Sequence, residues 1–465
     1  MLAALRAKAS ADTVPLTPLS RDQLDPWLAS QPPSVGSWLA ATAFAAEPGR
    51  VALIPNAEGR LARVVVGVAA DDHLWAYAAL PTTLPPGSYR IEREFDPQQG
   101  AQVALGWALG AYSFTRYRST QDKAPAQLIW PRGTDRSGVE RASDAITLVR
   151  DLINTPAADM GPAELAEVAS DLAEEFEGSL QVLVGDQLLE ANYPAIHAVG
   201  RASPRAPRLI DLSWGRRSDP KVTLVGKGVC FDTGGLDLKT SGNMLLMKKD
   251  MGGAAHALGL ARMVMMAGLP VRLRVLIPAV DNAVSGDALR PLDVIGTRKG
   301  LTVEVGNTDA EGRLILADAL AEAATERPAL LLDFATLTGA ARVALGTDLP
   351  ALFCNDDALA QSLTEAAAAT QDPLWRLPLW QGYRKGLESK IADLSNVASH
   401  SYAGAIIAAL FLESFVLPDV PWAHFDIMAW NPTPRPGRPE GGEAMTIRAA
   451  YAMIERRFGA RVQTG

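Results

Sequence analysis

Cysteine and histidine are both scarce in this 465-residue sequence, which contains two cysteines and five histidines. Cys230 and Cys354 are too few to form a disulfide framework. No apolar run approaches the roughly 18 residues of a membrane-spanning helix. The opening residues MLAALRAKASAD carry charges where a signal peptide needs an apolar stretch. Together these absences predict a cytoplasmic protein with no membrane partner.

An excess of positive charge is also missing. The chain has 44 lysines and arginines against 52 aspartates and glutamates, which gives a formal net charge of −8. Residues 1–140 hold 13 basic and 13 acidic side chains. Because proteins that bind nucleic acids usually present a basic surface, we do not expect nucleic acid as a partner.

Length and composition predict two domains. The chain exceeds the size of one ordinary domain, and 48% of its residues are hydrophobic, enough for a sizeable core. A stretch at 124–138 that contains proline, glycine and charged residues lies between apolar patterns and marks the expected boundary. We therefore expect a small N-terminal α/β domain over residues 1–135 and a larger C-terminal catalytic domain over residues 136–465.

Alternating strand-like and helical patterns predict α/β architecture in both domains. In the first, β-branched runs at 51–55 and 63–70 precede a helical pattern at 95–117. In the second, a helix through 144–156 leads to the expected strands, which lie at 221–226, 271–280, 302–307, 329–336 and 423–429. This pattern predicts a mostly parallel sheet flanked by helices.

Acidic residues are concentrated in two polar segments that each come at the end of an expected strand. KGVCFDTGG (227–235) follows the run at 221–226 and is itself followed by Lys239 and Asp250. The second segment is NTDAEGR, at 307–313. Because the carboxyl ends of parallel strands meet at one edge of an open sheet, we expect these segments to lie together.

These segments supply four carboxylates, those of Asp232, Asp250, Asp309 and Glu311, and neither segment contains a histidine. Carboxylate oxygens are hard ligands suited to Mg²⁺, Mn²⁺ or Zn²⁺. Asp309 and Glu311 are two residues apart, so their side chains can leave the backbone on the same side and reach adjacent metals. Four negative charges in one pocket need cations, and the sequence therefore predicts a dinuclear metal site.

Each of three acids also has an ordinary structural explanation. Asp250 opens a helical pattern and would serve as a cap, Asp309 would form an Asx turn, and Glu311 would be a solvated acid in the first turn of a helix. Their joint occurrence beside buried strands favours the metal site, because burying charges without partners is costly.

Several motifs carry a resemblance to a known family. They are DLINTPA (151–157), VGKGVCFDTGG (225–235), Lys239, MKKDMGGAA (247–255), NTDAEGRL (307–314), DFATLTGA (333–340), IADLSNV (391–397) and AGAIIAALFL (403–412). In these motifs the chain resembles the leucine aminopeptidase (cytosol aminopeptidase) family of dinuclear metallopeptidases. NTDAEGRL with its spaced upstream lysine and aspartate residues is the most specific part of the match.

The resemblance implies hydrolysis of N-terminal residues from peptides by a water or hydroxide that bridges two divalent cations, with zinc or manganese expected. The implied metal ligands are Lys227, Asp232, Asp250, Asp309 and Glu311, with Asp232 and Glu311 shared between the metals. Lys227 can ligate only as a neutral amine, and two adjacent dications would favour that form. Lys239 would stabilise the oxyanion, and Arg313 would hold a bicarbonate ion that transfers the proton. A homohexamer is also implied.

By position in the family pattern, the pocket for the first substrate side chain would be lined by Met247, Thr336, Gly339 and Met428. Many family members have a small alanine where this chain has Met428. If Met428 narrows the pocket, the preferred N-terminal residue differs from simple leucine preference. The alternative is that Met428 is an ordinary core methionine.

Two other functions stay open at this point. Some bacterial relatives in this family bind DNA as regulatory or recombination factors, although the charge balance of this chain speaks against that role. Another dinuclear metal hydrolase, such as a phosphoesterase, would use the same kind of site. Lys227, Lys239 and Arg313 at the family spacing favour the peptidase.

Overall fold

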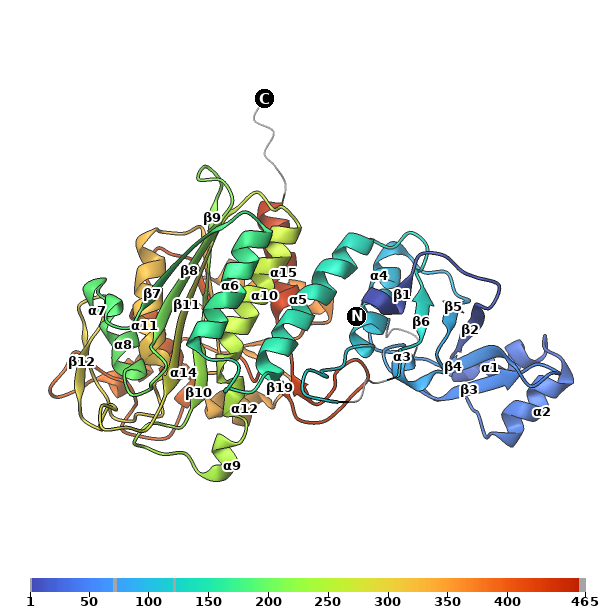
Figure 1. Cartoon of the computed structure of the whole chain (residues 1–465), viewed down its shortest axis with the longest axis horizontal. Coiled ribbons are helices and arrows are strands. Elements are labelled where there is room, and N and C mark those ends of the chain that lie inside the picture. The colour runs from blue at the N-terminus through green and yellow to red at the C-terminus, as the bar shows by residue number, and fades with distance from the viewer. Residues whose placement is uncertain (1, 70–72, 120–122, 460–465) are drawn as a thin grey trace. The chain divides into compact units, whose positions relative to one another are not determined.

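Figure 1 shows a computed structural model of the chain, which describes residues 2–69, 73–119 and 123–459. The chain forms two compact units. Unit 1 comprises residues 1–147 and 433–440, and unit 2 comprises residues 148–432 and 441–465. Helix α5 (Arg136–Asn154) runs from the first unit into the second. The domain boundary expected between residues 135 and 136 stays a prediction.

Unit 1 is built on a six-stranded sheet with the order β1-β6-β5-β2-β4-β3. The strands are β1 (Leu5–Arg6), β2 (Val14–Leu19), β3 (Val51–Pro55), β4 (Leu61–Gly67), β5 (Ser88–Ile91) and β6 (Gln127–Ile129). All neighbouring pairs are parallel except β3 with β4. The helices are η1 (Leu2–Ala4), α1 (Arg21–Leu28), α2 (Pro33–Ala41), α3 (Leu80–Thr83) and α4 (Pro97–Gly110).

Both strands expected in the first domain are present as β3 and β4, although residue 70 of the second run lies outside the described residues. The expected helix is α4, which is shorter than the pattern at 95–117. It begins where the carboxylate of Asp96 accepts a hydrogen bond from the backbone N–H of Gln99 at 2.8 Å, a typical N-cap.

Unit 2 contains a nine-stranded sheet with the order β16-β15-β18-β14-β9-β11-β8-β7, and β10 pairs with β11. The strands are β7 (Ser179–Val184), β8 (Arg208–Trp214), β9 (Lys221–Gly226), β10 (Gly228–Asp232), β11 (Arg272–Asn282), β14 (Leu330–Ala335), β15 (Ala351–Cys354), β16 (Trp375–Arg376) and β18 (Trp422–Asp426). The central neighbours β18, β14, β9 and β11 are parallel, which confirms the expected mostly parallel sheet.

Helices cover both faces of this sheet, with α10 and α15 on one side and α11 and α14 on the other (Figure 1). The longer helices are α6 (Pro162–Glu175), α10 (Gly252–Met266), α11 (Gly312–Thr325), α13 (Asp357–Thr370), α14 (Gly404–Glu413) and α15 (Ile447–Phe458). The shorter ones are α7 (Gln187–Glu190), α8 (Pro194–Gly200), α9 (Ser241–Met244), η2 (Met247–Met251), α12 (Gly339–Leu345) and η3 (Gln381–Leu387).

The start of α10 packs backbone against backbone on the sheet. A Cβ atom at Gly253 would lie 2.1 Å from the carbonyl oxygen of Phe334 in β14, and one at Gly226 would lie 2.6 Å from the Cα of Ala254. Only glycine permits this approach, which places the first turn of α10 directly over the ends of β9 and β14.

One expected strand belongs to a different sheet from the one predicted. The run at 302–307 was expected in the large parallel sheet, but only β13 (Thr302–Glu304) is a strand, and it belongs to a separate three-stranded sheet. Its neighbours there are β12 (Val294–Gly296) and β17 (Leu394–Ser395). A short β-branched run pairs equally well with any available edge, so its pattern alone does not select the sheet. Strands β19 (Trp430–Asn431) and β20 (Gly441–Gly442) form a further pair.

A buried carboxylate connects α11 to the start of α8. Asp318 in α11 accepts hydrogen bonds from the backbone N–H groups of Ala195 at 2.8 Å, Ile196 at 3.2 Å and Arg298 at 2.7 Å. Burial raises the pKa of Asp318 to about 7, and the three N–H groups oppose this rise. The side chain therefore titrates in the neutral range.

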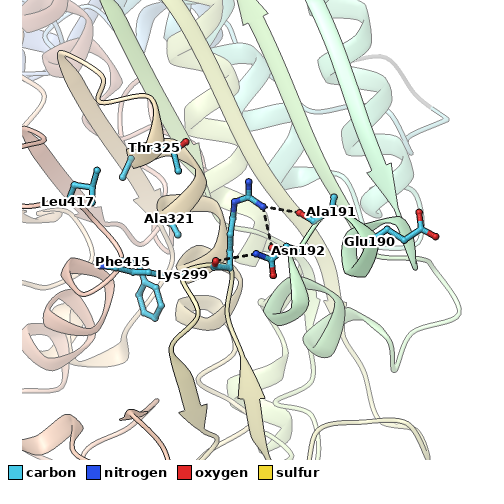
Figure 2. A pocket seen from close by; sticks show the side chains of 10 residues that line it. Glu190, Ala191, Asn192, Lys299, Ala321, Thr325, Phe415 and Leu417 are labelled. Atoms are coloured by element: carbon cyan, nitrogen blue, oxygen red, sulfur yellow. Dashed lines mark hydrogen bonds between the residues drawn. The ribbon is translucent and has the colours of Figure 1, made fainter.

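A surface hollow of about 500 Å³ lies next to this connection, with Asn192, Lys299 and Phe415 among its lining residues (Figure 2). Arg298 also lines it and donates hydrogen bonds to the carbonyl oxygens of Ala191 at 2.8 Å and Asn192 at 3.3 Å. None of the site residues predicted from the sequence lines this hollow. Within the described ranges, no helix combines the length and the apolar character needed to span a membrane.

We predict that Asp318 makes stability depend on pH. Folding raises the pKa of this carboxyl. The contribution of Asp318 to the free energy of unfolding is therefore fully present below the ordinary aspartate pKa of ~3.9 and is lost as the pH rises through about 7. The melting temperature of the Asp318→Asn protein should therefore fall less between pH 5 and pH 8 than that of the wild type. Parallel curves for the two proteins in differential scanning fluorimetry would contradict this assignment.

Candidate metal centre

Lys227 lies at the junction of β9 and β10, where its backbone is tied to two other elements. Its N–H donates to the carbonyl oxygen of Phe334 at 2.9 Å, and its carbonyl oxygen accepts from the N–H of Ala254 at 2.8 Å. The side chain is 4% exposed. Five residues further on, β10 ends at Asp232, so one nearly continuous stretch of strand delivers both residues.

The Lys227 amine joins two of the predicted ligands. Its Nζ lies 2.8 Å from Oδ2 of Asp250 and 3.0 Å from Oε1 of Glu311, and it donates to the carbonyl oxygen of Thr336 at 3.0 Å. Asp250 comes from η2, directly before α10, and Glu311 directly precedes α11. The Thr336 hydroxyl donates to Oδ1 of Asp250 at 2.8 Å.

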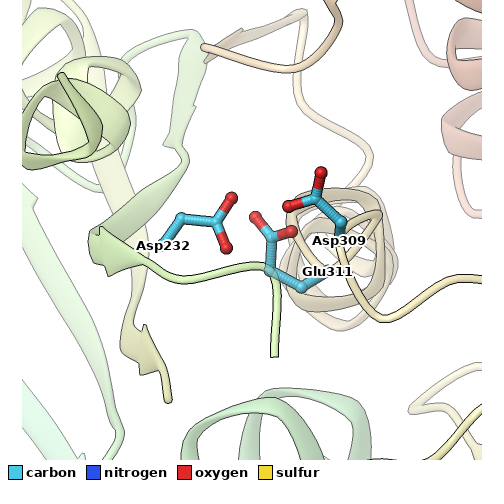
Figure 3. Close-up of side chains that lie close together, drawn as sticks. All are labelled: Asp232, Asp309 and Glu311. Carbon is cyan, nitrogen blue, oxygen red and sulfur yellow. The ribbon is translucent and has the colours of Figure 1, made fainter. Parts of the chain in front are cut away.

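Lys239 joins the other two predicted ligands. Its Nζ lies 2.9 Å from Oδ2 of Asp232 and forms an ion pair with Oδ1 of Asp309. Figure 3 shows the carboxylates of Asp232, Asp309 and Glu311 facing one another, and one oxygen from each of them lies within 4.8 Å of the others. The structure therefore brings together all five predicted ligands and Lys239.

Three residues that the sequence analysis did not single out hold the acids in place. The Asn282 side chain, at the end of β11, donates to Oδ1 of Asp232 at 2.9 Å and to the carbonyl oxygen of Thr308 at 3.1 Å. The Thr308 hydroxyl donates to the carbonyl oxygen of Gly234 at 2.6 Å. Asn396 accepts from the N–H of Gly306 at 2.7 Å. The polar pair Asp281 and Asn282, which directly follows the expected strand at 271–280, was the one available signal for Asn282.

Burial and charge perturb this cluster strongly. Burial lowers the pKa of Lys227, but the carboxylates of Asp250, Glu311 and Asp232 outweigh it and raise that pKa above its ordinary value. Burial, reinforced by Asp232, raises the pKa of Glu311 to about 8. Burial also raises the pKa of Asp232, with Asp250 adding to the effect. Close carboxylates that resist ionisation together are the environment that a bound cation relieves.

The donor set fits divalent metal ions. Within the described chain, Oδ2 of Asp250, Oδ1 of Asp309 and Oε1 of Glu311 are buried oxygens without a hydrogen-bond partner, although the two ammonium groups lie at ion-pair distance. Buried polar atoms in folded proteins are nearly always satisfied by protein groups, ordered water or a bound ion. Hard oxygen donors at this density suit Mg²⁺, Mn²⁺ or Zn²⁺.

Arg313 lies in the first turn of α11 and is 8% exposed. Its Nη1 donates to the carbonyl oxygen of Asn396 at 2.6 Å, while its Nε has no partner in the described part of the chain. Among the described residues, Arg313 forms no ion pair with the nearby acids. Burial lowers the pKa of Arg313 to about 10, against the opposing charges of Glu311 and Asp426.

The four predicted pocket residues adjoin four different elements. Met247 opens η2, Thr336 directly follows β14 and contacts Asp250, and Gly339 opens α12. Met428 follows β18, the parallel neighbour of β14, and is partly exposed. The carboxyl ends of these two strands therefore deliver Thr336 and Met428 to the same edge of the sheet. Their role in binding a substrate stays a prediction.

Comparison with known proteins agrees with this geometry. The model of the "Cytosol aminopeptidase family, catalytic domain" matches residues 147–451, and that of the "M17 aminopeptidase, N-terminal domain" matches residues 14–131. This chain belongs to the cytosol aminopeptidase family. It is accordingly a metal-dependent aminopeptidase, a peptide hydrolase of the leucyl aminopeptidase type.

Individual relatives of the aminopeptidase cover most of its length. A probable cytosol aminopeptidase of Roseiflexus castenholzii is 41% identical over 75% of this chain and 74% of its own, and Peptidase B of Serratia proteamaculans is 43% identical over 73% and 82%. Among solved structures, a cytosol aminopeptidase from Coxiella burnetii is 51% identical with a TM-score of 0.94, covering 98% of this chain and 100% of its own. The bottromycin maturation enzyme BotP in complex with Mn is 35% identical, with a TM-score of 0.86 over 96% and 100%.

We predict that Gly312→Ala damages the aminopeptidase through Lys227. A Cβ atom at position 312 would lie 2.4 Å from Cε and 2.7 Å from Nζ of Lys227, whose buried side chain is tethered by Asp250, Glu311 and Thr336. Metal affinity should fall by about 10- to 100-fold, as when the support of a ligand is lost. Gly242→Ala is the control, because a Cβ atom there meets nothing within 4 Å. Equal metal titrations for both variants would show that Lys227 is not constrained in this way.

Proposed function

We propose that this aminopeptidase removes N-terminal residues from peptides at a two-metal centre whose ligands are Lys227, Asp232, Asp250, Asp309 and Glu311. The observation that carries the proposal is the cluster of three facing carboxylates, which lie at ion-pair distance from Lys227 and Lys239. Two divalent cations there would lower the pKa of water towards about 7 and would polarise the peptide carbonyl. Zinc and manganese are the proposed metals.

Lys227 and Lys239 have different proposed roles because their surroundings differ. Lys227 is buried with its amine beside Asp250, Glu311 and Thr336, so its Nζ could reach a cation placed among those groups. Lys239 is more exposed, with 12% of its side chain accessible, and Asp232 and Asp309 overcome burial to raise its pKa. Acids raise the pKa of Lys227 as well, so exposure is what separates the two roles: the partly exposed ammonium of Lys239 is placed to donate to an oxyanion that forms on the substrate carbonyl.

Arg313 is proposed to hold the anion that transfers a proton. Guanidinium cannot act as a base, because it remains protonated throughout the neutral range. With Nη1 bound to Asn396 and Nε free among the described residues, the buried side chain still has donors for an oxyanion such as bicarbonate. Such an ion would accept the proton of the attacking water and return it to the leaving amine.

Further proposals concern the cellular location, the oligomeric state and the domain division of the enzyme. The two cysteines are free and buried, which supports cytoplasmic residence. We also propose a homohexamer, which is supported by exposed apolar side chains in unit 2 such as Trp375, Trp380 and Tyr402, since another copy would cover them. The domain division at residue 135 remains our proposal, and the family matches to residues 14–131 and 147–451 support it.

The deciding experiment is hydrolysis of a panel of aminoacyl 4-nitroanilides after reconstitution with Zn²⁺ or Mn²⁺. We expect activity that requires metal and a free substrate amine, with N-acetylated substrates inert. Glu311→Ala should lose at least about 10³-fold in kcat/KM because a shared ligand is removed. The control is Glu190→Ala, which removes an exposed carboxylate. Activity that survives in Glu311→Ala or on N-acetylated substrates would refute the proposed centre.

The proposed substrate pocket gives a separate prediction. Met428 should narrow the pocket, so Met428→Ala should shift the ranking of N-terminal residues towards bulkier side chains by roughly 10-fold in kcat/KM, the scale of one or two methylene groups. Met266→Ala, at the end of α10, is the matched control for loss of a partly exposed methionine. An unchanged ranking in Met428→Ala would make Met428 an ordinary packing residue.

A further inference from the structure

Unit 1 contains a crevice of about 960 Å³ that plays no part in the proposed peptidase chemistry. Most of its lining residues come from the ends of three adjacent parallel strands: residues 7 and 9 after β1, residues 90–95 from the end of β5 and residues 129–134 from the end of β6. Arg136, at the start of α5, completes the lining. The carboxyl edge of a parallel sheet is the usual place for a ligand crevice. The volume lies within the range of about 300–1,000 Å³ found for small-molecule sites.

Four arginines are among the lining residues of this crevice, Arg90, Arg93, Arg132 and Arg136. In the described part of the chain, none of the four forms an ion pair with a carboxylate. They are nearly a third of the 13 basic residues in positions 1–140. A cluster of arginines without ion pairs makes this part of the surface positive, although the net charge of the chain is −8.

The acids close to the crevice are mostly engaged elsewhere. Glu92 lines it, but its carboxylate pairs with Arg63 and accepts from the Thr17 hydroxyl at 2.8 Å. Asp96 caps α4 through the N–H of Gln99. That leaves Glu94, which also lines the crevice, as one carboxylate against four guanidinium groups.

Asp135 is also adjacent to the lining and is engaged in a similar way. Its Oδ1 accepts from the Ser137 hydroxyl at 2.7 Å and from the N–H of Gly138 at 3.1 Å, both at the start of α5. The carboxylate of Asp135 is therefore occupied by hydrogen bonds to the start of α5.

Two of the arginines are positioned by aromatic rings. The guanidinium carbon of Arg93 lies 5.8 Å from the ring centre of Phe95, and that of Arg136 lies 5.3 Å from the ring centre of Trp130. Phe95 is itself held edge-on by Tyr77, with ring centres 6.3 Å apart. Cation–π contacts of this length restrict a long side chain before any ligand arrives, which lowers the entropy lost on binding.

We propose that this crevice binds a small molecule that carries two or more phosphate or carboxylate groups. A guanidinium presents a planar pair of donors that matches both oxyanions, and four of them around one hollow favour a multivalent anion over a single charge. The proposal stands apart from the peptidase centre, so either one can fail without the other.

Isothermal titration of the full-length protein at constant ionic strength tests the proposal. The probes are fructose 1,6-bisphosphate, which carries two phosphates, and tricarballylate, which carries three carboxylates. Saturable binding of either probe is expected, and the tighter one identifies the anionic group. Arg93→Gln/Arg136→Gln should weaken binding by at least about tenfold, because it removes two charge-assisted contacts.

Two further variants complete the test. Arg132→Gln changes one exposed side chain of the crevice and should also weaken binding, even if the double variant fails to fold. Arg60→Gln is the control, because this exposed arginine lies in the turn between β3 and β4, outside the crevice lining. Aminopeptidase activity should be unchanged in all three proteins. Absence of saturable binding for both probes, or equal loss of affinity in Arg60→Gln and the crevice variants, would overturn the proposal.

Discussion

Repulsion between buried carboxylates is the constraint on which the second unit depends. Asp232, Asp250, Asp309 and Glu311 come from three separate parts of the chain, and all but Asp309 are buried. In a medium of low dielectric constant, negative charges this close together need positive charge between them. The fold supplies two lysines for this purpose and leaves oxygens that a cation would satisfy. Gly253 and Gly312 serve the same end, because each removes a side chain that would separate the elements carrying these groups.

Local patterns predicted the parts of this arrangement that are local. The strands at 221–226 and 329–336 and the four acids follow from residue type and spacing, because each pattern is complete within a few residues. The roles of Lys227 and Lys239 came from the resemblance of their motifs to the family. The place of β13 did not follow, since its partner β17 lies about ninety residues later and nothing within 302–307 specifies it. Asn282, Thr308 and Asn396 were missed for the same reason: an ordinary polar residue gains its role only from what the fold places beside it.

Charge counting had the same weakness in the first unit. Residues 1–140 contain equal numbers of basic and acidic side chains, so their net charge is close to zero. This balance does not reveal that the fold gathers four arginines around one crevice at the edge of the sheet. Positions 90, 93, 132 and 136 are neighbours because β5 pairs with β6, and the acids near them are used by helix ends and by Arg63. Net charge therefore says little about a surface until the topology is known.

Asn396 carries a consequence for how the enzyme is made. Its side chain and carbonyl oxygen bind Gly306, Asn307, Ala310 and Arg313, so it fixes the loop that presents Asp309 and Glu311. It is separated from Arg313 by 83 positions in the sequence. At the pace of translation the ribosome needs on the order of ten seconds to add that stretch. During this interval the acids already exist on the nascent chain without their final geometry, and the arrival of one asparagine completes the loop that holds them.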